Sequence, residues 1–201
     1  EKDRSDGHIG ERQHNYYLLQ LAHELKKPVH FHVGQENTPS DKTLDLLLED
    51  LEHVQDYVYR ISPNEFPEVV AVHAISSSCL PNGEFDKLAE KMKDREVKLI
   101  CCPKAAVSMI QENSINAPIH NSIANIWRFA VNGVKIKGLG TDNVNDIYIP
   151  ASGADVYDEA DYLANTLRFY DPRIIAKILS GTDLDDFDLG TIKQTLFSRN
   201  Q

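Results

Sequence analysis

No apolar run in this 201-residue sequence is long enough to cross a membrane as a helix, which takes about 20 residues. The first four residues, Glu1 to Arg4, also lack the apolar stretch of a secretory signal. We therefore expect neither a membrane partner nor secretion. Because residue 1 is not methionine, we also expect the gene to begin upstream of it.

Basic residues and cysteines are both scarce. The chain carries 21 Lys and Arg against 31 Asp and Glu, a formal net charge of −10, which repels phosphate backbones and argues against a nucleic-acid partner. Its three cysteines are Cys79 and the adjacent pair Cys101 and Cys102, an odd number that does not suit a disulfide framework. A reducing cytoplasm is the expected location.

The sequence alternates short apolar runs with amphipathic segments. β-branched runs bounded by turn residues predict strands, and apolar residues at a spacing of three and four predict helices. The predicted strands are 29–33, 68–73, 97–102 and 134–139. The predicted helices are 11–26, 41–58, 84–95, 122–132, 155–169 and 172–180. Ser40 or Asp41 is expected to cap the second of these helices.

This order predicts an α/β fold with a parallel sheet and crossover helices. A complete (β/α) barrel of the TIM type has eight strands in about 250 residues, so four strands make half of one. We expect residues 1–201 to form a single incomplete barrel domain with two unpaired strand edges, covered by the missing barrel half or by a second chain. An open doubly wound sheet of unrelated function is the alternative, but it calls for a glycine-rich phosphate loop that the sequence lacks.

Polar residues follow the predicted strands where each one ends. His30 and His32 share one face of their strand, His73 ends the second strand, and Asp142 comes just after the fourth. The C-terminal ends of parallel barrel strands meet at one face, where active sites form, and imidazole with carboxylate suits a divalent transition metal. Taken singly, each is better explained as a satisfied polar residue or a helix N-cap; together they favour a site. His30 is the weakest candidate because it lies one layer deeper.

Other candidates are better explained without a function. Cys101 and Cys102 point to opposite faces of a strand, so we expect buried free thiols. The acidic run from Asp183 to Asp188 lacks the spacing of a calcium loop and is expected to be a solvated tail. Among the histidines of loops and helices, His120 could line a loop over the pocket.

Several segments, in order along the chain, resemble cytosine deaminase-like members of the amidohydrolase superfamily. The likeness spans residues 4 to about 175 and makes this chain similar to the half of the barrel that holds strands 5 to 8. The matching segments are RSDGH at 4–8, before a helix like that after strand 4; VHFHVGQ at 29–35, like strand 5; VAVHA at 70–74, like strand 6; KLICCP at 98–103, like strand 7; and GLGTDNV at 138–144, like strand 8.

The resemblance implies a metal-dependent hydrolase acting on C–N bonds, either a cyclic amidine deaminase or an amide hydrolase. In that family a Zn or Fe ion binds two histidines of strand 1, one of strand 5 and the aspartate of strand 8, and activates a water at neutral pH. By this resemblance His32 and Asp142 are metal ligands, Asp142 is also a catalytic base, and His73 stabilises the oxyanion. The implied substrate is a small heterocycle or amide.

The chain departs from the family in two ways. Strands 1 to 4, with their His-x-His pair, are not in it, so we expect the isolated chain to be inactive. The position of the family's catalytic glutamate holds Gln35, whose carboxamide cannot shuttle protons, which puts ring deamination in doubt more than amide hydrolysis. A non-catalytic or degenerate barrel fragment that binds a ligand or complements a partner is the competing hypothesis.

Overall fold

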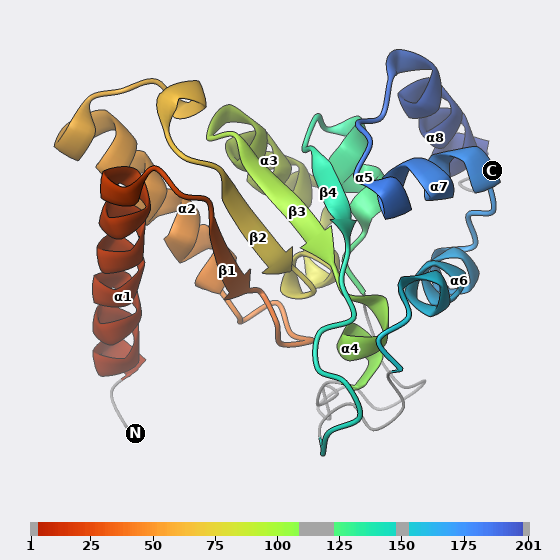
Figure 1. The fold of residues 1–201 in the computed structure, drawn as a ribbon, viewed down its shortest axis with the longest axis horizontal. Coiled ribbons are helices and arrows are strands. Elements are labelled where there is room, and N and C mark those ends of the chain that lie inside the picture. The colour runs from red at the N-terminus through yellow and green to blue at the C-terminus, as the bar shows by residue number, and fades with distance from the viewer. Residues whose placement is uncertain (1–3, 109–122, 148–152, 199–201) are drawn as a thin grey trace.

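The computed structural model describes residues 4–108, 123–147 and 153–198. Four strands form one parallel sheet in the order of the chain: β1 (Val29–Val33), β2 (Val69–His73), β3 (Val97–Cys101) and β4 (Ile136–Leu139). All four run in the same direction in Figure 1. This is the predicted α/β half-barrel arrangement.

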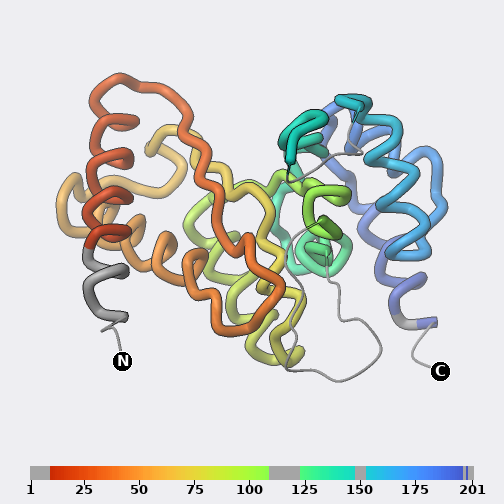
Figure 2. Tube along the Cα trace, turned by 90° about the horizontal axis from the view of Figure 1, so that it is seen from below, coloured from red at the N-terminus to blue at the C-terminus, as the bar shows by residue number. Residues whose placement is uncertain are grey.

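Helices connect the strands and pack against the sheet. α2 and α3 lie behind the strands in Figure 1. α1 lies at the β1 end of the sheet, and α6, α7 and α8 lie together at its β4 end. Figure 2, seen from below, shows the same two groups at opposite ends. The α-helices are α1 (Arg4–Leu25), α2 (Thr43–His53), α3 (Asn82–Asp94), α4 (Pro103–Ser108), α5 (Ile126–Val131), α6 (Val156–Leu167), α7 (Pro172–Ser180) and α8 (Asp186–Ser198); a π-helix (Val54–Tyr59) and two 3-10 turns (Pro63–Glu65 and Ser76–Cys79) complete the list.

The core lies between the sheet and the helices behind it. In β1, Phe31 and Val33 are buried, whereas His30 and His32 on the opposite face are exposed. The apolar stripe of α2 and that of α3 supply most of the facing side chains, because three- and four-residue spacing gathers them on one side of each helix. These are Leu44, Leu47, Leu48 and Leu51 of α2, and Phe85, Leu88, Ala89 and Met92 of α3.

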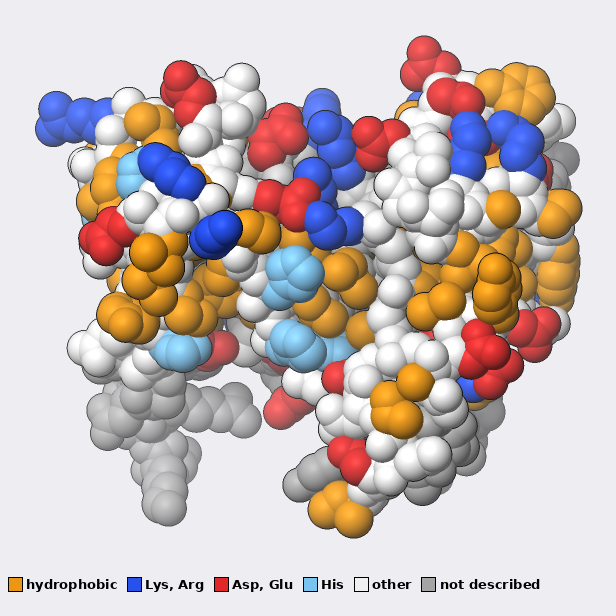
Figure 3. Space-filling model, in the orientation of Figure 1, with side chains coloured by type: hydrophobic (Ala, Val, Ile, Leu, Met, Phe, Trp, Pro, Cys, Tyr) orange, Lys and Arg blue, Asp and Glu red, His pale blue; other side chains and the backbone are white. Residues whose placement is uncertain are grey.

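The front face of the sheet is open to solvent in part. Figure 3 shows a hollow on this face, with histidine side chains in it and acidic and basic side chains nearby. Glu68, just before β2, pairs there with Lys98 of β3 and Lys137 of β4. Among the described residues, β1 and β4 each pair with one strand only, as expected for a half-barrel. α7 packs against β4 (Figure 1).

Two features of the C-terminal half differ from the sequence prediction. Pro103 does stop β3, but it also begins the unpredicted helix α4, because proline is tolerated in the first turn of a helix. The acidic run is not a solvated tail throughout. Asp188 is fully buried in α8, where it pairs with Arg173 and accepts a hydrogen bond of 2.6 Å from Lys177.

None of the helices that the structure describes is long and apolar enough to cross a membrane.

Candidate metal centre

The end of β1 is held to the start of α2 by hydrogen bonds to two side chains. The Gly34 amide donates to the Thr43 hydroxyl over 2.6 Å, and Asp41 accepts from the amides of Thr43 and Glu36, each over 3.0 Å. The expected cap at Ser40 or Asp41 is wrong, because the N-cap position of α2 is Lys42, which makes no side-chain cap hydrogen bond; Asp41 instead ties the preceding turn together. These contacts fix the loop after β1, so that His32 leads directly into a constrained turn.

His73 owes its orientation to an unusual backbone. It is paired in register with Val33, so strand alternation alone would turn its side chain away from His32. Its φ is +79° and that of Ala74 is +50°, in a region that residues with a Cβ seldom adopt. Rotation about φ redirects the imidazole toward His32. Such strain persists only where surrounding packing holds it, and it gathers at functional sites.

Asp142 lies in the loop after β4 and also has a positive φ, +55°. The Gly140 amide, two residues earlier, donates to the Cys101 carbonyl over 2.9 Å. A Cβ on Gly140 would lie 3.0 Å from the Cys102 sulfur, so the loop runs close over β3. This approach carries the Asp142 carboxylate toward β2.

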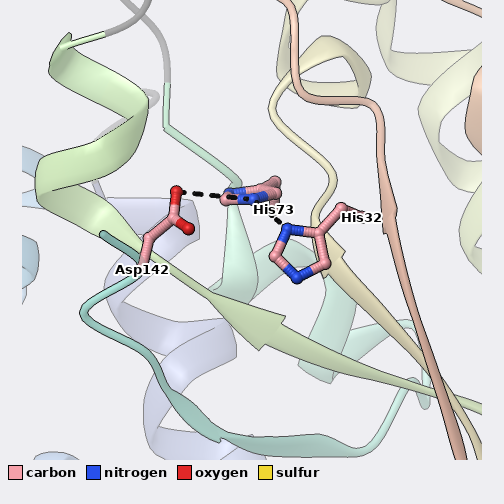
Figure 4. Close-up of side chains that lie close together, drawn as sticks. All are labelled: His32, His73 and Asp142. Atoms are coloured by element: carbon pink, nitrogen blue, oxygen red, sulfur yellow. Dashed lines mark hydrogen bonds and ion pairs between the residues drawn. The ribbon is translucent and has the colours of Figure 1, made fainter. Parts of the chain in front are cut away.

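The three side chains meet at the C-terminal ends of their strands (Figure 4). His73 Nε2 lies 3.1 Å from His32 Nδ1 and 3.7 Å from Asp142 Oδ2. One ligand atom from each residue lies within 4.8 Å of the other two. Two ligands on one ion, with bonds of about 2.1 Å, can be at most about 4.2 Å apart. The two distances from His73 Nε2 meet this limit, and the 4.8 Å bound on the whole set lies about 0.6 Å above it.

The chemistry of these donors fits zinc or iron. Two imidazoles and one carboxylate form a common ligand set for divalent transition metals. Burial lowers the pKa of His73 to about 4, with the Asp142 carboxylate opposing the shift and His32 adding to it. His73 is therefore neutral at pH 7, the form that can bind a metal. Its Nδ1 is buried and has no hydrogen-bond partner within the described parts of the chain.

The remaining candidates are not members of the three-residue cluster. Gln35 is half-buried in the loop after β1, and His30 is exposed on the open face of the sheet. Cys101 and Cys102 are buried free thiols, as expected, and burial raises the pKa of Cys102 to about 12, which leaves it a protonated, poor ligand. His120 lies outside the described residues.

Sequence reasoning missed one buried acid near the site. Glu159, in the first turn of α6, is 1% exposed, and its Oε2 accepts a hydrogen bond of 2.9 Å from the Lys104 amide. Acidic residues are common and solvated in first turns, so no pattern in the sequence distinguishes Glu159 from its exposed neighbour Asp158.

No family model matches the chain. Part of it is similar to a Haemophilus influenzae protein described as an uncharacterized protein, with 30% identity over 107 residues, which make up 53% of this chain and 35% of that protein.

Solved structures share the fold at low sequence identity. One is a 5-methylcytosine deaminase from Klebsiella pneumoniae, liganded with 5-fluorocytosine. Its alignment covers 89% of this chain and 40% of the deaminase chain, with a TM-score of 0.70 and 16% identity. Another is an N-isopropylammelide isopropylaminohydrolase from Burkholderia multivorans. Its alignment covers 86% of this chain and 38% of the aminohydrolase chain, with a TM-score of 0.60 and 18% identity. The chain thus has the fold of about two fifths of each of these enzymes.

Proposed function

We propose that this chain is the C-terminal barrel half of a metal-dependent hydrolase of the amidohydrolase superfamily, acting on C–N bonds of a small heterocycle or amide. The observation that carries the proposal is the convergence of His32, His73 and Asp142 at the C-terminal ends of parallel strands. Support comes from two neighbours of the same fold whose names describe a deaminase and an aminohydrolase.

His32 and Asp142 would hold the metal, which when bound supplies a water activated for attack at neutral pH. Asp142 has a second task, because its free carboxylate oxygen can accept a proton from the attacking water. His73 is close enough to complete a three-residue ligand set in this chain. In a complete barrel, its neutral imidazole would face the substrate and stabilise the oxyanion.

Gln35 narrows the substrate class. Ring deamination needs a group that carries a proton to the ring and to the leaving amine, and a carboxamide cannot do so. Gln35 can still hydrogen-bond a substrate. The proposal therefore favours amides or N-substituted heterocycles, for which proton transfer through Asp142 is less dependent on a second shuttle.

Activity would require the rest of the barrel, on the same polypeptide or on a second chain. The edges of β1 and β4 that pair with no strand in the described part of the chain offer the places for its strands. A non-catalytic binding or partner-complementing module is the second candidate. Gln35 favours it, because a chain that has lost catalysis no longer needs an acid at this position.

The test is hydrolysis of a panel of cyclic amidines and amides in the presence of Zn or Fe. The chain alone should show little or no turnover, and a barrel completed with the other four strands should hydrolyse amides or N-substituted heterocycles. Asp142→Ala should abolish that activity. Full activity of the Asp142→Ala enzyme would refute the catalytic proposal, and an inactive complete barrel that binds the heterocycles would favour the binding module.

A further inference from the structure

Glu159 is a buried acid that the proposed chemistry does not use. Its side chain lies between α6 and α4, two helices that pack against each other. Oε2 accepts from the Lys104 amide, whereas Oε1 is buried and has no hydrogen-bond partner in the described part of the chain. Burial of a carboxyl group with one oxygen unsatisfied is costly, so a structural or functional gain must offset it.

The hydrogen bond between Glu159 and the Lys104 amide fixes the turn between β3 and α4. Pro103 has no amide hydrogen, so the Lys104 amide is the first free donor of α4, and Glu159 satisfies it from another helix. Cys102 directly precedes this turn. Its sulfur packs against Gly140, where a Cβ would come within 3.0 Å. The position of the turn therefore determines where the loop after β4 can run.

That loop carries Asp142. We propose that Glu159 is a positioning residue for the metal centre: through the Lys104 amide it sets the β3–α4 turn, and through Cys102 and Gly140 this turn holds Asp142 facing His73. The proposal rests on the proposed function, because it assigns Glu159 a role toward the same ligand set. Burial raises the pKa of Glu159, and the hydrogen bond from the Lys104 amide opposes this rise.

Three variants of the whole chain separate this role from simple stabilisation. Glu159→Ala removes the acceptor. Glu159→Gln keeps a carbonyl oxygen for the Lys104 amide and removes only the acid. Asp158→Asn is the matched control, because Asp158 is an exposed neighbour that pairs with the Lys104 ammonium over 3.1 Å and not with the amide.

Two readouts are needed, both taken well below the melting temperature of each variant. One is Zn or Co(II) affinity by titration, and the other is amide hydrogen exchange along the chain. Glu159→Ala should weaken metal affinity by up to about tenfold, the lower end of the 10- to 100-fold cost of removing a direct hydrogen-bond partner of a metal ligand, because Glu159 acts on Asp142 only through the turn. It should also speed exchange at Lys104 and at Gly140. Glu159→Gln and Asp158→Asn should leave metal affinity and exchange close to those of wild type, because both keep an acceptor for the Lys104 amide.

The outcomes discriminate clearly. Unchanged affinity in Glu159→Ala, or exchange that rises evenly over the whole chain, would overturn the positioning role. A Glu159→Gln variant that folds but loses affinity as Glu159→Ala does would overturn it as well, because charge would then be the essential property. If wild type binds no metal yet Glu159→Ala speeds exchange selectively at Gly140, the control of the Asp142 loop by Glu159 stands, and the metal-ligand role of that loop in this chain falls. If Glu159→Ala does not fold, Glu159→Asp takes its place, because its shorter side chain withdraws the acceptor from the Lys104 amide, with the same expected and contrary results.

Discussion

Gly34 follows β1, and its carbonyl accepts a hydrogen bond of 3.0 Å from the Ser76 amide beyond β2; replacing Gly34 by alanine should be strongly destabilising. Its φ is +60°, and a Cβ there would lie 2.9 Å from the Ser76 hydroxyl oxygen and 3.1 Å from the Ala74 Cα. A left-handed conformation costs a residue with a Cβ about 1–2 kcal/mol. Overpacking against a backbone atom adds about 1–3 kcal/mol. Gly34→Ala should therefore lower the free energy of unfolding by about 2–5 kcal/mol.

A second glycine provides a control of opposite sign. Gly190 lies exposed inside α8, and nothing lies within 4 Å of where its Cβ would be. Alanine is favoured over glycine in a helix by about 1 kcal/mol, so Gly190→Ala should stabilise the chain by up to that amount. Urea unfolding followed by circular dichroism measures both differences. A Gly34→Ala chain as stable as wild type, with an unchanged m-value, would refute the geometry derived for the ends of β1 and β2.

Two further predictions concern the centre itself. His73 has its pKa lowered to about 4 when folded, against 6.5 in the unfolded chain, so the unfolded state binds the extra proton between these values and stability falls as the pH falls across that window. Relative to His73→Asn in metal-free buffer, the wild-type free energy of unfolding should drop by on the order of 3 kcal/mol from pH 7 to pH 4; a flat difference would contradict a buried neutral imidazole. Gln35→Glu in a completed barrel should raise ring deamination at least about tenfold by restoring a proton shuttle, towards the 10²–10⁴-fold typical of general acid–base help. Equal deamination rates in the wild-type barrel and in the Gln35→Glu variant would show that this position does not move protons.

The architecture follows from local pattern. Period-two alternation in β1 separates Phe31 and Val33 from His30 and His32, and the structure buries the first pair and exposes the second. Turn residues and apolar stripes also predicted every described strand to within two residues. These features depend on neighbours in the sequence, and one chain is enough to predict them.

What could not be predicted depends on tertiary contacts. Strand alternation does not reveal that His73 turns toward His32, because this follows from a positive φ held by packing. Asp188 looks like one acid in a solvated run until Arg173 and Lys177 of α7 are seen to bury it. Glu159 is likewise distinguished only by the amide across from it. In each case the deciding partner lies elsewhere in the chain.

The central claim is that His32, His73 and Asp142 form one metal centre. A crystal structure of the zinc-loaded chain, with anomalous diffraction measured at the zinc edge, tests it most directly. The account predicts one zinc ion with an imidazole nitrogen of each histidine and a carboxylate oxygen of Asp142 at about 2.0–2.2 Å. A zinc ion bound at other residues, or no anomalous peak among these three, would contradict it.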